Sequence, residues 1–211
     1  MFISIELISL YVLLPVIFYF QWLEKAYFSP VLLVVLIYTA IVLYRYNCFK
    51  NSDLFYFGAI QHLKVILLRF IVSAILLTII TLYYFPDLFL RFPAQRPQLW
   101  LLVMILYPVL SAYPQEVISR VFFFQRYAHL FPNIQILILV NALLFAWMHI
   151  LFGNWIAIIL SFIGGLFFAQ TYHKTRSVLL VTIEHALYGN FLFTIGLGWF
   201  FYHGNQLGVA S

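Results

Sequence analysis

Residues 98–124 read QLWLLVMILYPVLSAYPQEVISRVFFF, an apolar run that carries Glu116 and Arg120 within it. A run of this length crosses the ~30 Å hydrocarbon core of a bilayer as a helix, since each residue advances a helix by about 1.5 Å. An ionisable side chain at such depth costs about 2.5–3.5 kcal/mol on insertion scales, so one that is retained is usually paired or functional. This stretch therefore predicts a membrane helix with a buried polar site.

The composition of the chain is that of an integral membrane protein. Of its 211 residues 65% are hydrophobic and 8% are charged, and the mean hydropathy is +1.03. The net charge is +5, but the basic residues lie in short connections between apolar runs. That distribution is typical of membrane topology and of contact with the lipid bilayer, and it argues against a nucleic-acid partner. The single cysteine, Cys48, excludes an internal disulfide.

Apolar runs long enough to cross a bilayer recur along the whole chain. They lie near residues 5–23, 30–46, 64–85, 98–124, 133–152, 154–172 and 177–202. The sequence therefore predicts an all-α polytopic membrane helix bundle with about seven transmembrane helices. The range is about six to eight, because a break at Gly189-Asn190 would divide the last run and the first two runs are the least specific. We expect N-terminal spans over residues 1–96, a core over 97–202 and a short C-terminal tail over 203–211.

The basic residues of the connections indicate the orientation. With seven spans, one side receives Arg45, Lys50, Lys64, Arg126, Lys174 and Arg176, and the other receives Lys25, Arg91 and Arg96. Cytoplasmic loops carry the excess of lysine and arginine, so we expect the N-terminus in the cytoplasm and the C-terminus on the opposite side. The start of the chain lacks a basic segment and a small-residue cleavage site, which indicates a retained first span. A bacterial cytoplasmic membrane is the expected location.

Three of the later runs carry polar residues suited to catalysis. Glu116 and Arg120 are four residues apart and share a helix face, while His149 and His185 each lie alone in another run. Taken singly, the ion pair can simply tie the bundle together, and each histidine can be a hydrogen-bonded core residue. On three helices of one bundle, a glutamate and two histidines can instead deprotonate a water that attacks a peptide carbonyl. We expect these side chains to converge on one polar cavity.

The same residues allow two other hypotheses. One carboxylate and two histidines form the ligand set of many catalytic zinc sites, although the usual His-Glu-x-x-His helix is absent. A zinc-dependent hydrolase would lose activity with a chelator, whereas a site that activates water through glutamate and histidine needs no cofactor. The third hypothesis is a catalytically silent protein that binds or escorts a membrane peptide in the same cavity.

Three motifs in order resemble those of the CAAX protease and bacteriocin-processing (CPBP, or Abi) family of intramembrane endopeptidases. That family shows Glu-Glu-x-x-x-Arg in one span, Phe-x-x-x-His in the next and His-x-x-x-Asn, or a close variant, in a later one. Here they read Gln115-Glu116-x-x-x-Arg120, Phe145-x-x-x-His149 and His185 followed by Asn190. The match covers roughly residues 97–200, and the order and spacing of the motifs make the set more specific than any one of them.

The resemblance implies a helical membrane fold with a cavity open toward the cytosol and a membrane-associated peptide or protein as substrate. It also implies that a glutamate activates water with help from His149, while His185 and Asn190 bind the oxyanion. Gln115 stands at the position of the water-activating glutamate. An amide has no proton-accepting equilibrium near neutral pH, so the role of base passes to Glu116.

The last apolar run contains two further polar residues near His185, Asn190 and Glu184. Asn190 lies five residues after His185, about 140° around a straight helix, so we expect a kink at Gly189 to bring it round. Glu184 is an additional carboxylate, which serves either as a substitute base or as the partner of a basic group.

Overall fold

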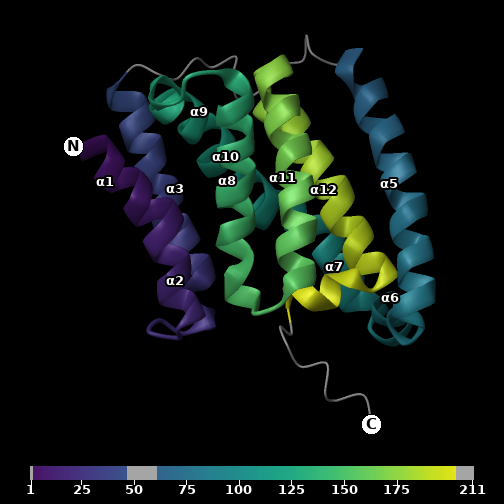
Figure 1. Ribbon diagram of the computed structural model, residues 1–211. Helices are drawn as coiled ribbons and strands as arrows, with labels where there is room; N and C mark the ends of the chain where they lie inside the picture. Colours follow the sequence, from purple (N-terminus) through teal and green to yellow (C-terminus); the bar gives the residue numbers. More distant parts are fainter. Residues whose placement is uncertain (1, 47–60, 203–211) are drawn as a thin grey trace.

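A computed structural model describes residues 2–46 and 61–202, which are mostly helical and contain no strand. Figure 1 shows long helices packed side by side, with α1 to α3 at one edge of the bundle and α5 at the other. Of the residues named above, Cys48, Lys50 and the tail 203–211 lie outside the described part of the chain.

The N-terminal elements are α1 (Phe2–Ile8), the π-helical turn η1 (Ser9–Leu13), α2 (Leu14–Tyr19), η2 (Lys25–Tyr27) and α3 (Phe28–Arg45). The next are α5 (Leu63–Tyr84), η4 (Pro86–Leu88) and α6 (Arg91–Gln95). One long pass then comprises α7 (Pro97–Tyr107), η5 (Pro108–Ala112), α8 (Tyr113–Glu116), η6 (Val117–Phe122), α9 (Phe123–Tyr127) and η7 (Ala128–Leu130). The last elements are α10 (Ile134–Trp147), η8 (Met148–Phe152), α11 (Trp155–Thr175), α12 (Val178–Ile195) and η9 (Leu197–Phe201).

The predicted membrane helix bundle is confirmed. Among the described residues, 6 helices are long and apolar enough to cross a membrane, and Ile3–Tyr19 forms a shorter apolar helix before them. Each of these seven helices coincides with one of the predicted runs. The last run is one helix rather than two, since α12 continues through Gly189 to Ile195.

Short polar connections set the ends of the three C-terminal passes. The side chains of Asn133, Asn154 and Ser177 each accept a hydrogen bond from the backbone N–H three residues on, at 2.9, 2.8 and 3.3 Å. Such caps satisfy N–H groups that have no partner within the helix. Gly153 and Gly196 end the preceding segments with φ of 68° and 103°, a left-handed conformation that glycine adopts without steric cost. These local signals place the helices that carry His149 and His185.

The N-terminal helices pack into the same core as the later passes. The Tyr11 hydroxyl donates to the Ile118 carbonyl in the π-helical turn η6 at 2.7 Å. Glu6 forms an ion pair with Arg126 at 3.0 Å and accepts a hydrogen bond from the Tyr38 hydroxyl at 2.8 Å. These contacts hold α1, α3 and α9 together.

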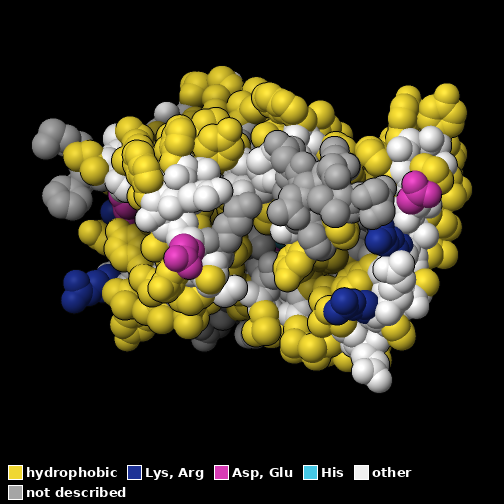
Figure 2. Space-filling view, turned by 90° about the horizontal axis from the view of Figure 1, so that it is seen from below, with side chains coloured by type: hydrophobic (Ala, Val, Ile, Leu, Met, Phe, Trp, Pro, Cys, Tyr) yellow, Lys and Arg dark blue, Asp and Glu magenta, His cyan; other side chains and the backbone are white. Residues whose placement is uncertain are grey.

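Successive passes alternate in direction, so the connections collect at two ends of the bundle. The upper end in Figure 1 has the start of α1, the end of α3, the start of α5 and the connections that follow α9 and α11; the lower end has those that follow α2, α5 and α10. The basic residues are divided as predicted, with Arg45, Lys64, Arg126, Lys174 and Arg176 toward the upper end and Lys25, Arg91 and Arg96 at the lower end. Figure 2 shows the lower end as largely hydrophobic with a few charged side chains.

Candidate functional site

The long pass α7–η7 carries the first part of the site, and two π-helical turns shape it. Pro108 begins η5 and lacks the N–H that a regular helix would use there. Residues four apart drift by about 40° around a regular α-helix, and a π-helical turn, which closes i→i+5, is wider and offsets that drift. Tyr107, Ser111 and Gln115 consequently line one cavity from a single helix. Glu116, the next residue, faces the bundle interior and does not line that cavity.

Glu116 lies at the centre of a buried charged network. Its Oε1 is 2.8 Å from His185 Nδ1 and its Oε2 is 3.1 Å from Arg120 Nε, and the side chains of Glu116 and Arg120 are 0% exposed. Arg120 Nη1 donates to Asn141 Oδ1 at 2.7 Å, and Asn141 Nδ2 donates to the Ser119 carbonyl at 2.7 Å. The network joins the long pass to α10 and α12, and each Glu116 oxygen already has a cationic or hydrogen-donating neighbour.

His185 links this network to the cavity. Its Nδ1 contacts Glu116, and its Nε2 is 2.9 Å from the Tyr107 hydroxyl oxygen. The ring stacks on Phe168, with centroids 4.7 Å apart and an angle of 20° between the planes. Because a carboxylate only accepts, Nδ1 carries a hydrogen, and Nε2 either accepts from the tyrosine or, in the imidazolium, donates to it. His185 is therefore fixed in orientation from both sides.

His149 presents the cavity with an unsatisfied nitrogen. Its Nδ1 donates to the Phe145 carbonyl at 2.7 Å, an oxygen left free where α10 gives way to η8. A carbonyl cannot donate, so this contact fixes the hydrogen on Nδ1 and leaves a lone pair on Nε2. Among the described residues Nε2 has no hydrogen-bond partner, and His149 lines the same cavity as His185. The Phe145 ring is close to both imidazoles, with its centroid 4.9 Å from that of His149 and 5.7 Å from that of His185.

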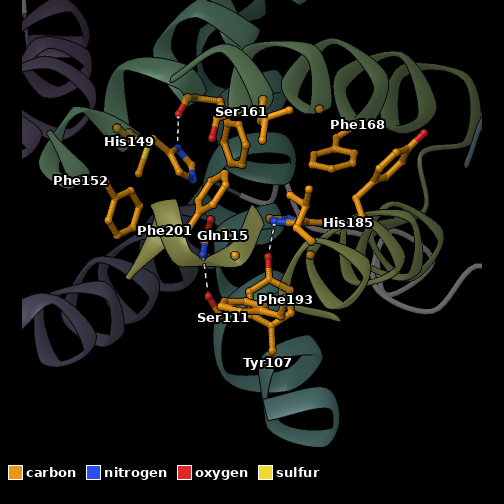
Figure 3. Close-up of a pocket in the computed structure, with 18 of the residues that line it drawn as sticks. Tyr107, Ser111, Gln115, His149, Phe152, Ser161, Phe168, His185, Phe193 and Phe201 are labelled. Carbon is orange, nitrogen blue, oxygen red and sulfur yellow. Dashed lines mark hydrogen bonds between the residues drawn. The ribbon is translucent and has the colours of Figure 1, made fainter. Parts of the chain in front are cut away.

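The cavity has a volume of about 540 Å³, within the ~300–1,000 Å³ of typical ligand sites. Its wall is mostly aromatic and aliphatic, and none of the described acidic residues, lysines or arginines lines it. In the view of Figure 3, Gln115 lies between His149 and His185, with its amide nitrogen donating to the Ser111 hydroxyl at 2.8 Å. That bond leaves the Gln115 carbonyl oxygen available as an acceptor. The Ser161 hydroxyl, which is buried and has no hydrogen-bond partner within the described part of the chain, lies beside His149 in the same view.

The cavity lies toward the lower end of the bundle, away from most of the basic connections. Its walls include the start of α3 at Phe28 and Ser29, the turn η8 and residues 198–202, all at the end where α10 and α12 finish. The expected cytoplasmic N-terminus and the expected cytosolic opening therefore conflict, since they put opposite ends of the bundle in the cytosol.

The zinc hypothesis requires Glu116, His149 and His185 as joint ligands. Within residues 2–46 and 61–202, no three His, Cys, Asp or Glu side chains are grouped closely enough to hold a metal ion. Glu116 and His185 are in contact, while the Nδ1 of His149 is hydrogen-bonded to the Phe145 carbonyl. The described residues thus provide a pair of contacting ligands rather than a set of three.

Comparison with known families fits this geometry. Residues 97–192 match the family described as type II CAAX prenyl endopeptidase Rce1-like. This segment is similar to the Rce1-like family. It comprises the long pass, α10, α11 and most of α12, the elements that bear Gln115, His149 and His185, and it confirms the resemblance drawn from the three motifs. Neither a curated protein nor a solved structure matches the chain.

Within the Rce1-like segment, the structure separates the predicted site residues into two groups. Gln115, Phe145, His149 and His185 line the cavity, whereas Glu116 and Arg120 lie behind it and contact it only through His185.

Two other predicted residues lie outside the cavity. Asn190 donates to the Met104 carbonyl on α7 at 3.1 Å, and the kink expected at Gly189 is absent because α12 is regular there. Glu184 is the partner of a basic group, since its Oε1 lies 2.9 Å from Arg69 Nη2 on α5.

Sequence reasoning missed Tyr107, Ser111 and Ser161 as cavity residues of the Rce1-like segment. Tyr107 and Ser111 precede Gln115 by eight and four residues, so the spacing of polar groups along one helix could have shown them. Gly189 was taken for a hinge, but it is the place where the Tyr107 ring packs against α12. A glycine needed for close packing and one needed for a bend look alike in a sequence.

Proposed function

We propose that this protein is an intramembrane endopeptidase of the CAAX-protease type, in which His149 takes the proton from the attacking water. The observation that carries the proposal is the free Nε2 lone pair of His149 in a cavity whose other titratable groups are engaged. The Rce1-like match to residues 97–192 supports a protease fold around that cavity. Peptide hydrolysis also suits the size and the mainly apolar wall of the cavity, which fit an extended, membrane-associated peptide.

The proposed reaction needs one base and one oxyanion donor. Water adds to the peptide carbonyl carbon while His149 Nε2 accepts one of its protons. The carbon becomes tetrahedral and the former carbonyl oxygen becomes an oxyanion. When the C–N bond breaks, the protonated His149 gives that proton to the departing amine, so the imidazole is neutral again. Gln115 acts through its carbonyl oxygen as an acceptor that orients water, a role that needs no change of charge.

Glu116 acts in this proposal as a positioning residue. Its contact with His185 holds that ring toward Tyr107, and its contact with Arg120 gives the carboxylate a cationic partner in a site with no exposure to solvent. The expected role of Glu116 as the water-activating base does not suit this geometry, because both of its oxygens are engaged behind the cavity wall. The base is therefore assigned to His149.

A second candidate function is peptide binding without hydrolysis. The observation that favours it is Gln115, a neutral amide in the cavity at the position where the family motif has its first glutamate. With no carboxylate in the wall, the same cavity would bind or escort a membrane peptide and leave it intact. Both candidates place the protein as an integral membrane protein with a membrane-associated peptide partner, and we propose a bacterial cytoplasmic membrane with a cytoplasmic N-terminus.

The test is cleavage of a membrane-anchored peptide library by the full-length protein in lipid nanodiscs. The variants are His149→Ala, Gln115→Glu and the matched control His129→Ala, which removes an exposed histidine outside the cavity. We expect the wild type and the control to cleave equally with or without chelator, and His149→Ala to lose about 10²–10⁴-fold in rate.

Other outcomes favour the alternatives. Cleavage by Gln115→Glu alone would identify the wild type as a binding protein. Activity removed by chelator and restored by zinc would support the metal-dependent hydrolase. Undiminished cleavage by His149→Ala would exclude His149 as the base.

A further inference from the structure

Tyr107 and Gly189 form a close pair across the interface of α7 and α12. A Cβ atom built on Gly189 would overlap the Cε1, Cζ and Oη atoms of Tyr107, so the tyrosine ring occupies the space that a side chain would need. α12 is regular and φ of Gly189 is not positive, which means that glycine is required here for space and not for backbone conformation. The sequence thus leaves a gap in α12 that Tyr107 fills.

The packing of the Tyr107 ring in this gap fixes the direction of its hydroxyl. The ring packs edge-on against Phe193, with centroids 5.5 Å apart, and the hydroxyl oxygen lies 2.9 Å from His185 Nε2. His185 is held in turn by Glu116, which is paired with Arg120. A chain of contacts therefore runs from a buried ion pair to one phenol on the cavity wall, and Figure 3 shows that phenol on the side of the cavity occupied by His185.

This series of contacts determines which groups the Tyr107 hydroxyl can donate to. When His185 is an imidazolium beside Glu116, its Nε2–H donates to the phenol oxygen, and the phenol O–H is free to donate into the cavity. A hydroxyl that is itself a hydrogen-bond acceptor from a cation is a stronger donor, because hydrogen bonds in a chain polarise one another.

Tyr188, a second tyrosine on the wall, lacks this support. The Tyr188 hydroxyl lies 3.3 Å from Ser73, and no charged group is hydrogen-bonded to that pair among the described residues. Asn190, the amide expected to bind the oxyanion, is directed at Met104. Tyr107 is thus a wall hydroxyl that is both oriented and connected to a buried charge.

We propose that the Tyr107 hydroxyl, seated against Gly189 and held by His185, donates a hydrogen bond to the substrate carbonyl oxygen as that oxygen becomes negative. This inference rests on the proposed peptidase function, because it names the oxyanion donor of that reaction. No bond of the tyrosine is broken: the O–H hydrogen stays on Tyr107 while the negative charge on the substrate oxygen rises and falls. Removing one oxyanion donor typically lowers kcat by about 10²–10³-fold.

The first experiment compares Tyr107→Phe with the matched control Tyr127→Phe. Both replace a tyrosine of the long pass, but the Tyr127 hydroxyl has no hydrogen-bond partner among the described residues and lies outside the cavity. For the best-cleaved library peptide, we expect Tyr107→Phe to lower kcat about 10²-fold or more with KM changed less than about threefold. The control should match the wild type in both constants.

A second experiment distinguishes the effect of the Tyr107 hydroxyl from the effect of packing its ring against Gly189. Gly189→Ala should lower the thermal midpoint, and combining it with Tyr107→Ala should recover most of that loss, because the overlapping ring is then gone. The double variant Tyr107→Ala/Gly189→Asn places an amide four residues after His185 in the vacated space. We expect it to recover part of the kcat lost in Tyr107→Ala.

Binding measurements distinguish failure of this inference from failure of the proposed function. The probes are the library peptide that binds most tightly and its phosphinate analogue, whose anionic tetrahedral centre mimics the intermediate. Tyr107→Phe should weaken binding of the phosphinate at least tenfold and leave peptide binding unchanged. If the wild type cleaves and Tyr107→Phe cleaves equally fast, the inference is overturned while the peptidase stands. If the wild type cleaves nothing, the peptidase proposal fails, and equal phosphinate binding by both proteins overturns the inference as well.

Discussion

Replacing Arg120 by methionine leaves a buried carboxylate without its cationic partner. Glu116 and Arg120 are both 0% exposed, and the guanidinium also donates to Asn141 at 2.7 Å and lies 4.6 Å from the Phe145 ring centroid. Breaking one side of a buried ion pair typically costs about 3–5 kcal/mol, since the remaining charge has no compensation. In a protein of this size each kcal/mol shifts the thermal midpoint by about 2–4 °C, so we expect a loss of roughly 6–20 °C.

The assay is thermal unfolding in detergent, with Arg126→Met as the matched control. Arg126 also pairs with a glutamate, but its side chain is 18% exposed, and Glu6 keeps the hydrogen bond from Tyr38 when the arginine is removed. A pair of that kind is typically worth about 0–1 kcal/mol, so the control should shift by less than about 4 °C. The double variant Glu116→Leu/Arg120→Met should lose less than the two single variants together, because it leaves no unpaired charge. Equal shifts for Arg120→Met and Arg126→Met would refute the buried network as a major source of stability.

Three further predictions concern parts of the fold around the site. Glu184→Leu leaves Arg69, which is 20% exposed, without its partner and should lower the thermal midpoint by several degrees, and Glu184→Gln, which keeps an acceptor but loses the charge, should lower it nearly as much; a loss confined to the leucine variant would contradict a charge effect. Gly196→Ala forces a side chain into a φ of 103° and should cost about 1–3 kcal/mol in chemical denaturation, against no change if the helix end relaxes. Excess basic charge at the upper end predicts that this end faces the cytoplasm and the lower end faces outward. A cysteine placed in residues 86–96, at the lower end, should therefore react with a membrane-impermeant thiol reagent added outside intact cells. Labelling of residues 131–133 instead would reverse the orientation and place the cavity end in the cytosol.

The membrane spans follow from the sequence because hydrocarbon permits few backbone arrangements. Every peptide group in lipid must be hydrogen-bonded internally, so an apolar run of sufficient length predicts a helix whatever its neighbours are. The contact between Glu116 and Arg120 is predictable for a related reason, since their spacing brings them to one face. The contact between Glu116 and His185 was expected only as convergence on a common cavity.

The rotation of each helix could not be predicted in the same way. These helices are apolar on every side, so no hydrophobic stripe marks the face that points inward. In the long pass the π-helical turns shift the rotation further, which is why Gln115 and not Glu116 reaches the cavity. Asn190 was misplaced for the opposite reason, because a bend was expected in a helix that is regular.

The buried ion pairs lie outside the cavity wall, and this arrangement has consequences for both substrate binding and catalysis. Glu116 is paired with Arg120 and Glu184 with Arg69 outside the cavity wall, and none of the described acidic residues, lysines or arginines lines the wall. A mainly apolar peptide can therefore enter without stripping water from carboxylate, ammonium or guanidinium groups, which would oppose binding. Hydrolysis then has to create new charge in that space, a proton on His149 and a negative oxygen on the substrate. The buried ion pairs already hold His185 in place, so Tyr107 can meet the new oxyanion without reorganisation, and preorganised donors of this kind stabilise a transition state most strongly.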